Sequence, residues 1–180
     1  MIETNRLLMR PHSITDFDPY LTLWKQALRR GIVAPSAQPL NEEESWARLL
    51  RMIGHWTTFS FGPFVVIDRA SSSIIGEVGF ANMHRGQGPS FDDVPEAMWK
   101  VDHSNQGRGI AKEAMQATIA WFDSRNISPR TVCMIDQHNI ASRRVAESLE
   151  FREFAYAIYR EHSVIMFQRN VTREVTAAKS

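Results

Sequence analysis

The middle of the chain alternates between the residue patterns of strands and helices, and this alternation restricts the possible folds more than any other feature. Residues 96–102 (EAMWKVD) and 131–136 (TVCMID) have the patterns of strands, the second of them covered on both faces. Apolar rows at helical spacing occupy residues 110–122, and Asn139 precedes a second helical pattern. Because parallel strands are joined by such crossovers, the order predicts an α/β fold with a partly parallel sheet.

Further strand patterns lie on both sides of this central region. Residues 6–10 (RLLMR) predict a short strand at one edge of the sheet. Residues 61–81 contain two β-branched runs separated by turn formers, which predict an antiparallel hairpin. Residues 151–159 and 163–169 predict two final antiparallel strands. We therefore expect a mixed sheet of about seven strands with helices on both faces.

Two helices and a loop complete the expected elements. An apolar period near 3.6 residues follows two aspartates and predicts a helix that ends near Gly31. Asn41, followed by three glutamates, is typical of a capped helix start, and Gly54 is the expected end of that helix. Residues 82–95 contain several turn formers and two acids, and we expect a long exposed loop there.

The composition excludes some classes of function. The chain has 21 basic and 20 acidic side chains and a formal net charge of +1, so no overall field attracts nucleic acid or a membrane surface. The single cysteine, Cys133, and the lack of an apolar leader or membrane-length run indicate a protein of the reducing cytoplasm. The length fits one domain, which we place at residues 1–169, with a flexible tail at residues 170–180.

Residues 106–111 (QGRGIA) lie between a predicted strand and a predicted helix. Gly107 and Gly109 allow a ligand to approach backbone N–H groups closely, while Arg108 and the positive end of the helix dipole attract phosphate oxygens. A Walker loop does not fit, because an acidic residue follows Lys112 where Ser or Thr is needed. A dinucleotide-binding turn usually follows the first strand of a sheet. A plain turn into a helix stays the alternative to a phosphate site.

Gln106-x-x-Gly109-x-Ala111 matches the Q/R-x-x-G-x-G/A signature of the GNAT N-acetyltransferase superfamily, at the start of a long helix where that family has it. Further segments resemble its RimJ/RimL-like branch in order and spacing: RLLMRP, IIGEVGF at 74–80, EAMWKVD, and N-x-x-S-x-x-V-A-E-S-L-E-F at 139–151. The resemblance covers residues 2–168. It implies a single-domain GNAT-like fold in which the two central parallel strands part like a V.

The resemblance implies acetyl-CoA as the acetyl donor, bound in this V. Backbone groups of Trp99 and Val101 would pair with pantetheine, and N–H groups of the glycine turn would bind the pyrophosphate. The implied cofactor-binding residues are Trp99, Val101, Gln106, Gly107, Arg108, Gly109, Ile110, Ala111 and Asn139. Asn139 also fits a plain helix N-cap, which does not exclude a cofactor contact. We expect no metal, because six histidines and one cysteine show no ligand spacing.

The implied reaction needs a base for the attacking amine and a proton for the leaving thiolate. Glu96 stands where the family has an acidic residue at the start of the strand, and we predict it as the general base, directly or through a water molecule. A carboxylate that orients the substrate, or is simply solvated, is the alternative. Glu77, on the neighbouring strand, is the second candidate for the base.

The candidate for the acid is Ser142, which fills the place of a serine in the RimJ/RimL-like branch. It would orient the thioester or relay a proton to sulfur, and the alternative is an ordinary helix residue that bonds to Asn139. Many GNAT enzymes use a tyrosine of this helix, but the helix contains none here. Tyr156 and Tyr159, farther along the chain, are the remaining candidates for the acid.

These residues together predict an N-acetyltransferase that transfers acetyl from acetyl-CoA to a primary amine by direct attack. Cys133 lies in mid-strand and is a poor nucleophile candidate. The alternative is a non-catalytic acyl-CoA-binding sensor or interaction module. The acceptor is a small molecule or a protein N-terminus, and no residue chooses between them. A homodimer would be in keeping with the family.

The tryptophans of the first helical region and the acids of the predicted loop allow two interpretations each. Trp24, Trp46 and Trp56 fit core packing or walls of the acceptor pocket. Asp92 and Asp93 fit solvated loop acids or groups that attract an amine. Glu150 stands where the family usually has glycine, and a left-handed turn at this position would cost on the order of 1 kcal/mol.

Overall fold

The computed structural model describes residues 1–25 and 40–171 of the 180-residue chain. They form one mixed sheet in the order β1-β2-β3-β4-β5-β6-β8-β7, in which β5 and β6 are parallel and all other neighbours are antiparallel. The strands are β1 (Ile2–Glu3), β2 (Leu7–Pro11), β3 (Phe64–Asp68), β4 (Ile74–Ala81), β5 (Glu96–Val101), β6 (Arg130–Asp136), β7 (Arg152–Tyr159) and β8 (His162–Asn170). The predicted α/β fold with a partly parallel sheet is confirmed.

The described sheet has eight strands, one more than expected. The additional strand is β1, which pairs with β2 through Ile2↔Met9 and Glu3↔Leu8. The prediction that residues 6–10 form an edge strand is therefore wrong, since β1 lies outside them. Two residues are too few to give a detectable alternation of apolar and polar side chains.

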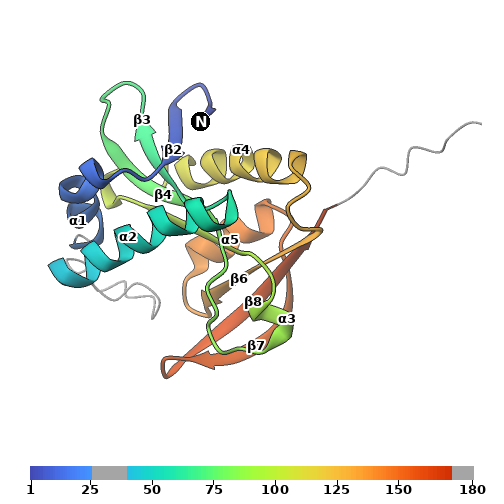
Figure 1. Cartoon of the computed structure of the whole chain (residues 1–180). Coiled ribbons are helices and arrows are strands. Elements are labelled where there is room, and N and C mark those ends of the chain that lie inside the picture. Colours follow the sequence, from blue (N-terminus) through green and yellow to red (C-terminus); the bar gives the residue numbers. More distant parts are fainter. Residues whose placement is uncertain (26–39, 172–180) are drawn as a thin grey trace, which may run out of the picture.

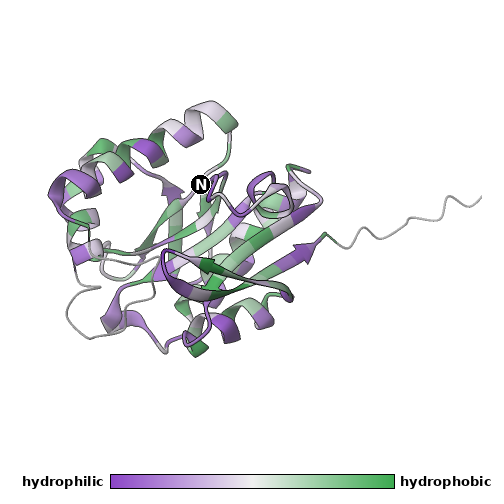
Figure 2. Ribbon diagram, turned by 90° about the horizontal axis from the view of Figure 1, so that it is seen from below, coloured by the Kyte–Doolittle hydropathy of each residue, from purple (hydrophilic) through white to green (hydrophobic). Residues whose placement is uncertain are grey.

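The helices lie on both faces of the sheet, as expected. The α-helices are α1 (Phe17–Lys25), α2 (Glu42–Phe59), α3 (Pro89–Asp92), α4 (Ile110–Ser124) and α5 (Ile140–Ser148), with short 3-10 helices at Ile14–Asp16 and His103–Asn105. The helices α1 and α2 pack together on one side of the sheet (Figure 1). The helix α5 lies on the opposite side, where α4 contacts it (Figure 2).

Alternation along β4 shows which side chains face which helices. Glu77 lies beside Tyr20 of α1 and Arg48 of α2. The next residue, Val78, belongs instead to the main core cluster together with Phe122 of α4. Successive strand residues point to opposite faces, so β4 separates the layer of α1 and α2 from the layer of α4.

The same alternation holds on β5. Ala97, Trp99 and Val101 pack with the main core. The residues between them, Glu96, Met98 and Lys100, therefore face the side of α1 and α2, and Lys100 is the cross-strand partner of Glu77. The alternation of the sequence predicts this same division of residues 96–101 into two faces, and the prediction is correct.

The main core fills the space between the sheet and α4. The predicted apolar rows of this helix are confirmed, because Ile110, Ala114, Met115, Ile119 and Phe122 are all buried. The ring of Phe122 lies 4.2 Å from that of Phe80 and 5.4 Å from that of Phe61, measured between centroids. Such aromatic packing fixes α4, and with it the glycine turn at its start.

The helix α2 does not end at Gly54, as the sequence predicts, but continues to Phe59. It begins as expected, with Asn41 as N-cap in a capping box with Glu44. It ends where Ser60 takes a left-handed conformation and donates its N–H to Trp56 C=O. Gly54 lies on an exposed part of the helix, where glycine is tolerated at a modest cost.

The segment 82–95 is not the wholly exposed loop that the sequence predicts. It contains the short helix α3, and Phe91 in that helix is only 1% exposed. Phe91 packs in a small second cluster with Val132 of β6 and Met166 of β8. The packing of this one large apolar side chain thus holds the segment 82–95 against the sheet, next to the start of β5.

The end of α5 bears on two expectations. The sequence assigns Ile140, Val145, Ala146 and Leu149 to the inner face of this helix. Val145, Ala146 and Leu149 do pack against the main core, but Ile140 is 49% exposed, so its assignment is wrong. Glu150 has φ 67°, so the left-handed turn forms in spite of the missing glycine. The neighbouring Phe151 N–H donates to Ala146 C=O at 3.0 Å, as in a Schellman helix end.

Two other expectations concern ends of elements. The predicted end of the first helix, near Gly31, lies outside the described residues, as does most of the predicted tail. Within the described part, β8 extends to Asn170. No helix of residues 1–25 and 40–171 is long and apolar enough to cross a membrane.

Candidate active site

The strands β5 and β6 are in register at one pair only, Glu96↔Val132. The backbone N–H of Val132 donates to Pro95 C=O at 3.1 Å, and toward their carboxyl ends the two strands separate. The V-shaped split that the sequence predicts is therefore confirmed. A cavity of about 1180 Å³ lies along it, with walls from β5, β6, the starts of α4 and α5, and one face of α2.

The glycine turn forms one end of this cavity. Gly107 has φ 73° and Gly109 has φ 75°, a left-handed conformation that favours glycine. A Cβ atom built on Gly107 meets nothing within 4 Å, so the backbone borders open space. Gly109 is the N-cap of α4, whose first N–H groups have no partner inside the helix. This turn provides the N–H groups and the room that a diphosphate needs.

The turn is held from two sides. Arg6 donates from Nη1 to the carbonyl oxygen of Arg108 at 3.0 Å and forms an ion pair with Glu113 in the first turn of α4. Gln106 donates from Nε2 to the carbonyl oxygen of Val101 at 3.0 Å, which connects the turn to the end of β5. These contacts keep the N–H groups in place before any ligand binds.

Most of the predicted cofactor-binding residues lie on the cavity wall. They are Trp99, Val101, Gln106, Gly107, Gly109, Ile110, Ala111 and Asn139. Arg108 is not on the wall; its guanidinium donates to Asn105 Oδ1 at 2.7 Å. The structure thus brings eight of the nine residues together and leaves the Arg108 side chain directed to its own loop.

Asn139 and Ser142 meet at the start of α5, also on the cavity wall. Asn139 is the N-cap of the helix, and its Oδ1 accepts a hydrogen bond from the Ser142 N–H at 3.0 Å. The capping role of Asn139 and the position of Ser142 as the third helix residue are therefore observed. A cofactor contact of Asn139 and a proton relay by Ser142 are compatible with this geometry, because both residues border the cavity.

Glu96 lies where β5 and β6 part and is 5% exposed. Its carboxylate forms a bidentate ion pair with Arg85, in which Arg85 Nε donates to Oε2 at 2.6 Å and Nη2 donates to Oε1 at 2.8 Å. Burial raises the pKa of the Glu96 carboxyl above its usual value, and the nearby Arg85 only partly opposes this rise. Glu96 is thus a buried carboxylate of increased basicity on the cavity wall.

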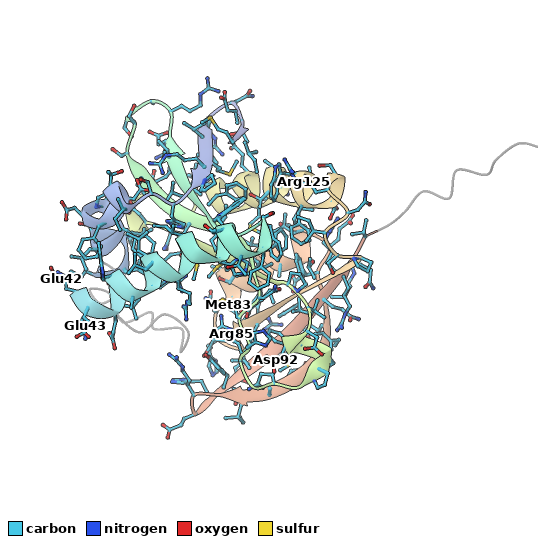
Figure 3. The ribbon with its side chains drawn as sticks, in the orientation of Figure 1. Glu42, Glu43, Met83, Arg85, Asp92 and Arg125 are labelled. Carbon is cyan, nitrogen blue, oxygen red and sulfur yellow. The ribbon has the colours of Figure 1, made fainter. Side chains whose placement is uncertain are left out.

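Arg85 is a residue of the site that sequence reasoning missed. Its backbone N–H donates to Asp92 Oδ1 at 2.6 Å, while its Nη1 donates to Tyr159 Oη at 3.1 Å. Figure 3 shows Arg85 and Asp92 close together below α2. Asp92 is therefore neither a solvated acid nor a free amine-binding group, because it organises the loop that carries Arg85. Tyr159, which the sequence analysis gives only as a remaining candidate for the acid, lies on the cavity wall.

Glu77, the second candidate for the base, is 1% exposed and has three polar neighbours. Arg48 Nη2 lies 2.8 Å, His12 Nε2 3.1 Å and Tyr20 Oη 3.4 Å from its carboxylate oxygens. Burial by itself raises the pKa of Glu77, but Arg48 and His12 outweigh it and lower this pKa to about 2. A carboxylate with so low a pKa is a weak base.

Two expectations about other chemistry can be compared with the structure. Cys133 is 1% exposed, and burial raises the pKa of its thiol well above the usual value, which does not favour a nucleophilic thiolate. Within the part of the chain that the structure describes, no group of three or more His, Cys, Asp or Glu side chains could hold a metal ion.

The elements that build this cavity belong to a known family. The family model described as the acetyltransferase (GNAT) domain matches residues 6–152. The chain belongs to the GNAT acetyltransferase family. The match includes the hairpin, β5, the glycine turn, β6 and α5, so it covers the elements that form the cavity.

Solved structures show the same fold. A Bordetella pertussis protein assigned to the GNAT acetyltransferase family is 34% identical, with 93% of this chain and 98% of that chain covered and a TM-score of 0.85. An acetyltransferase from Agrobacterium tumefaciens is 23% identical, covers 94% of both chains and has a TM-score of 0.76. RimL, a ribosomal alpha-N-protein acetyltransferase solved with coenzyme A, is 18% identical, with 93% and 96% covered and a TM-score of 0.74.

Proposed function

We propose that the protein is an N-acetyltransferase that moves the acetyl group of acetyl-CoA to a primary amine by direct attack. The observation that carries this proposal is the placement along one cavity of the glycine turn, the split between β5 and β6, and the buried carboxylate of Glu96. The turn fits a diphosphate and the split fits an extended chain. The fold is shared with RimL, whose structure contains coenzyme A.

The residues that would hold acetyl-CoA follow the cavity wall. Backbone groups of Trp99 and Val101 face the split and would pair with the pantetheine amides. The N–H groups from Gly107 to Ala111 would bind the pyrophosphate, with Gln106 bracing the turn. Asn139 would contact the cofactor from α5. The Arg108 guanidinium would reach a phosphate oxygen only by leaving Asn105.

Glu96 would take a proton from the attacking amine, directly or through a water molecule. Acetyl-CoA supplies the thioester whose carbonyl carbon the amine attacks. As the C–N bond forms, the nitrogen loses a proton to Glu96, and then the C–S bond breaks. A raised pKa makes Glu96 a better proton acceptor near neutral pH. Arg85 positions this carboxylate, and the remaining lone pairs can orient an amine.

The leaving thiolate needs a proton, and two hydroxyls on the cavity wall could provide it. Ser142 stays our first candidate, at the start of α5. Tyr159 becomes the second, because its hydroxyl lies on the same wall in contact with Arg85. Glu77 is not proposed as a base, since its low pKa and its bond to Arg48 give it a structural role instead.

Other parts of the proposal rest on the sequence. We propose membership of the RimJ/RimL-like branch from the motifs at 74–80 and 139–151, and a cytoplasmic location from the single cysteine. The acceptor is a small molecule or a protein N-terminus, and a homodimer is the proposed assembly. We propose no nucleic-acid or membrane partner, because the net charge is close to zero.

The second candidate function is a non-catalytic module that binds acyl-CoA. The observation in its favour is the ion pair between Arg85 and Glu96, in which both carboxylate oxygens already accept hydrogen bonds. The two functions differ in turnover and not in cofactor binding.

Release of coenzyme A separates the two functions. The purified protein is mixed with acetyl-CoA and a panel of primary amines, free thiol is measured, and mass spectrometry detects the acetylated amine. We expect one coenzyme A released for each amine acetylated. Binding of acetyl-CoA without thiol release above the amine-free blank, for every amine, would support the module and contradict the enzyme.

A further inference from the structure

The cavity extends beyond Glu96 to the side of the sheet that α1 and α2 cover. There its wall carries three cations, Arg48 and Arg51 from α2 and Lys100 from β5, beside the indole of Trp24. The Arg48 guanidinium carbon lies 4.2 Å, and Lys100 Nζ 3.8 Å, from the centre of the Trp24 ring. These four residues, which we call the cationic cluster, have no part in the chemistry proposed above.

Two buried donor atoms of the cluster have no hydrogen-bond acceptor among the residues that the structure describes. The Arg48 side chain is 10% exposed, and its Nη2 is bound to Glu77. Its Nε and the Lys100 Nζ have no hydrogen-bond partner within residues 1–25 and 40–171. Buried charged donors are normally paired, so this wall is suited to accept an anionic group from a ligand.

Positive charge exceeds negative charge on this wall. Burial lowers the pKa of Lys100 to about 8, and Arg48 adds to this effect while Glu77 opposes it. Arg51 is exposed, and partial desolvation together with the nearby Arg48 lowers the pKa of its guanidinium. Glu77 is already occupied by Arg48 and His12, and the exposed Glu44 accepts a bond from the N-cap of α2. The three cationic side chains therefore lie close together, and the neighbouring carboxylates do not neutralise all of their positive charge.

We propose that the cationic cluster binds a carboxylate of the acceptor, so that the acceptor is a small molecule with both a primary amine and a carboxylate. The inference rests on the proposed function, because the amine end is assigned to Glu96. The donors are buried under α1 and α2, so the carboxylate must enter the cavity itself, which favours a compact molecule over a protein surface. The same cations disfavour polyamines by repulsion.

The spacing along β5 indicates the shape of this acceptor. Glu96, Met98 and Lys100 share one face of the strand, and Met98 lies on the cavity wall between the two charged residues. Four residues of strand span about 13 Å between the Cα atoms of Glu96 and Lys100. Met98 offers an apolar surface to methylene groups. An amine and a carboxylate separated by several methylenes fit this arrangement.

The test compares matched acceptors, 6-aminohexanoate and its carboxamide, at saturating acetyl-CoA. We expect kcat/KM for the carboxylate to exceed that for the amide by on the order of ten- to a hundred-fold, since buried charge-assisted bonds are lost with the amide. In Lys100→Met this ratio should fall toward one, while Lys100→Arg should keep much of it. The control Lys25→Met, at the exposed end of α1, should keep the ratio of the wild type.

Equal kcat/KM for the two acceptors, with coenzyme A still released, would overturn the inference and leave the proposed function intact. Preference for an aminoalkyl phosphonate or for an acidic peptide would also overturn it. If no amine is acetylated, the proposed function fails. In that case calorimetric titration of 6-aminohexanoate tests separately whether the cationic cluster binds a carboxylate. Binding that Lys100→Met weakens and Lys25→Met retains would support the carboxylate site, and absence of binding to the wild type would contradict it.

Discussion

Glu77 and Glu96 are buried carboxylates on the same face of neighbouring strands, yet their surroundings give them opposite acid–base properties. Arg48 and His12 lower the pKa of Glu77 to about 2, whereas burial raises the pKa of Glu96 in spite of Arg85. Environments that drive two pKa values apart in this way give the two carboxyl groups different acid–base properties, which is why the proposed function assigns the base to Glu96 and not to Glu77. Each carboxylate therefore has a different predicted response to the same substitution.

Glu96→Gln is expected to lower kcat while the affinity for acetyl-CoA survives, because the amide keeps the shape but cannot accept a proton. General-base catalysis contributes roughly 10²–10⁴-fold, which sets the expected loss. In the wild type, we expect activity to fall as the pH decreases through the raised pKa of Glu96, and this acidic limb should disappear in the variant. A pH profile of kcat/KM checks both effects.

The matched control is Glu147→Gln, an exposed glutamate of α5 outside the cavity wall. Its profile should equal that of the wild type. If Glu96→Gln retains the acidic limb, the base must be another residue.

Glu77→Gln is expected to destabilise the fold by about 3–5 kcal/mol, because it leaves the buried Arg48 without its charged partner. The pKa of Glu77 is lowered on folding from 4.5 to about 2, so ionised Glu77 stabilises the protein fully above pH 4.5. That contribution is lost as the pH falls from 4.5 to about 2.

Urea unfolding between pH 7 and pH 2.5 measures this effect. The difference in unfolding free energy between wild type and Glu77→Gln should shrink as the pH falls through this window. If the difference in unfolding free energy does not depend on pH, then Arg48 and His12 do not lower the pKa of Glu77 in the folded protein.

At the residue scale, Glu96, Ser142 and Asn139 belong to motifs with fixed spacing, and all three lie on the cavity wall, while their roles in the reaction stay predictions. The sequence could not predict Arg85. This residue reaches Glu96 only because Phe91 and Asp92 fold the segment 82–95 back on the sheet. The signal was present in the two acids and the buried aromatic residue of that segment, but their partners are determined by tertiary packing.

At the scale of elements, long periodic segments were predicted well and element ends were not. The rows of α4 and the hairpin of β3 and β4 follow from side-chain spacing alone. The strand β1 and the helix α3 are too short to have a period, so they were missed. The end of α2 was misplaced because glycine in an exposed helix position only weakens the helix.

Gly54→Ala is expected to stabilise the protein by about 0.5–1 kcal/mol, since alanine has the higher helix propensity and the added Cβ meets nothing within 4 Å. Chemical denaturation checks this value. The contrasting substitution is Gly76→Ala, where the Cβ would lie 2.5 Å from the carbonyl oxygen of Lys100 and should destabilise β4 and β5. Loss of stability in Gly54→Ala would show that α2 does not continue through this residue.

At the scale of the whole molecule, the helical crossover predicts the parallel pair of β5 and β6, whereas the split between these strands is implied only by the resemblance to the GNAT family. The glycine-turn end of the cavity was predictable from local sequence, since it consists of one turn and the helix after it. The cationic cluster was not predictable, because Arg48, Arg51 and Lys100 meet only when α2 packs across β4 and β5. Recognition of the acceptor therefore depends on packing that no local pattern encodes.

The glycine turn also permits a direct comparison of two glycines. Gly107 and Gly86 have nearly the same backbone, with φ 73° and 75°, and at both a Cβ would meet nothing within 4 Å. Only Gly107 lies on the cavity wall. A valine at either position introduces similar backbone strain, but only the valine at Gly107 would occupy the space assigned to the pyrophosphate.

Calorimetric titration of acetyl-CoA into the wild type, Gly107→Val and Gly86→Val tests the central claim most directly. We predict one site per chain with a Kd below about 1 mM, in the range of typical enzyme substrates. Gly107→Val should weaken binding by at least about ten-fold, which corresponds to 1.4 kcal/mol, and Gly86→Val should bind like the wild type. No binding to the wild type at millimolar acetyl-CoA, or equal weakening by both valines, would contradict the proposed site.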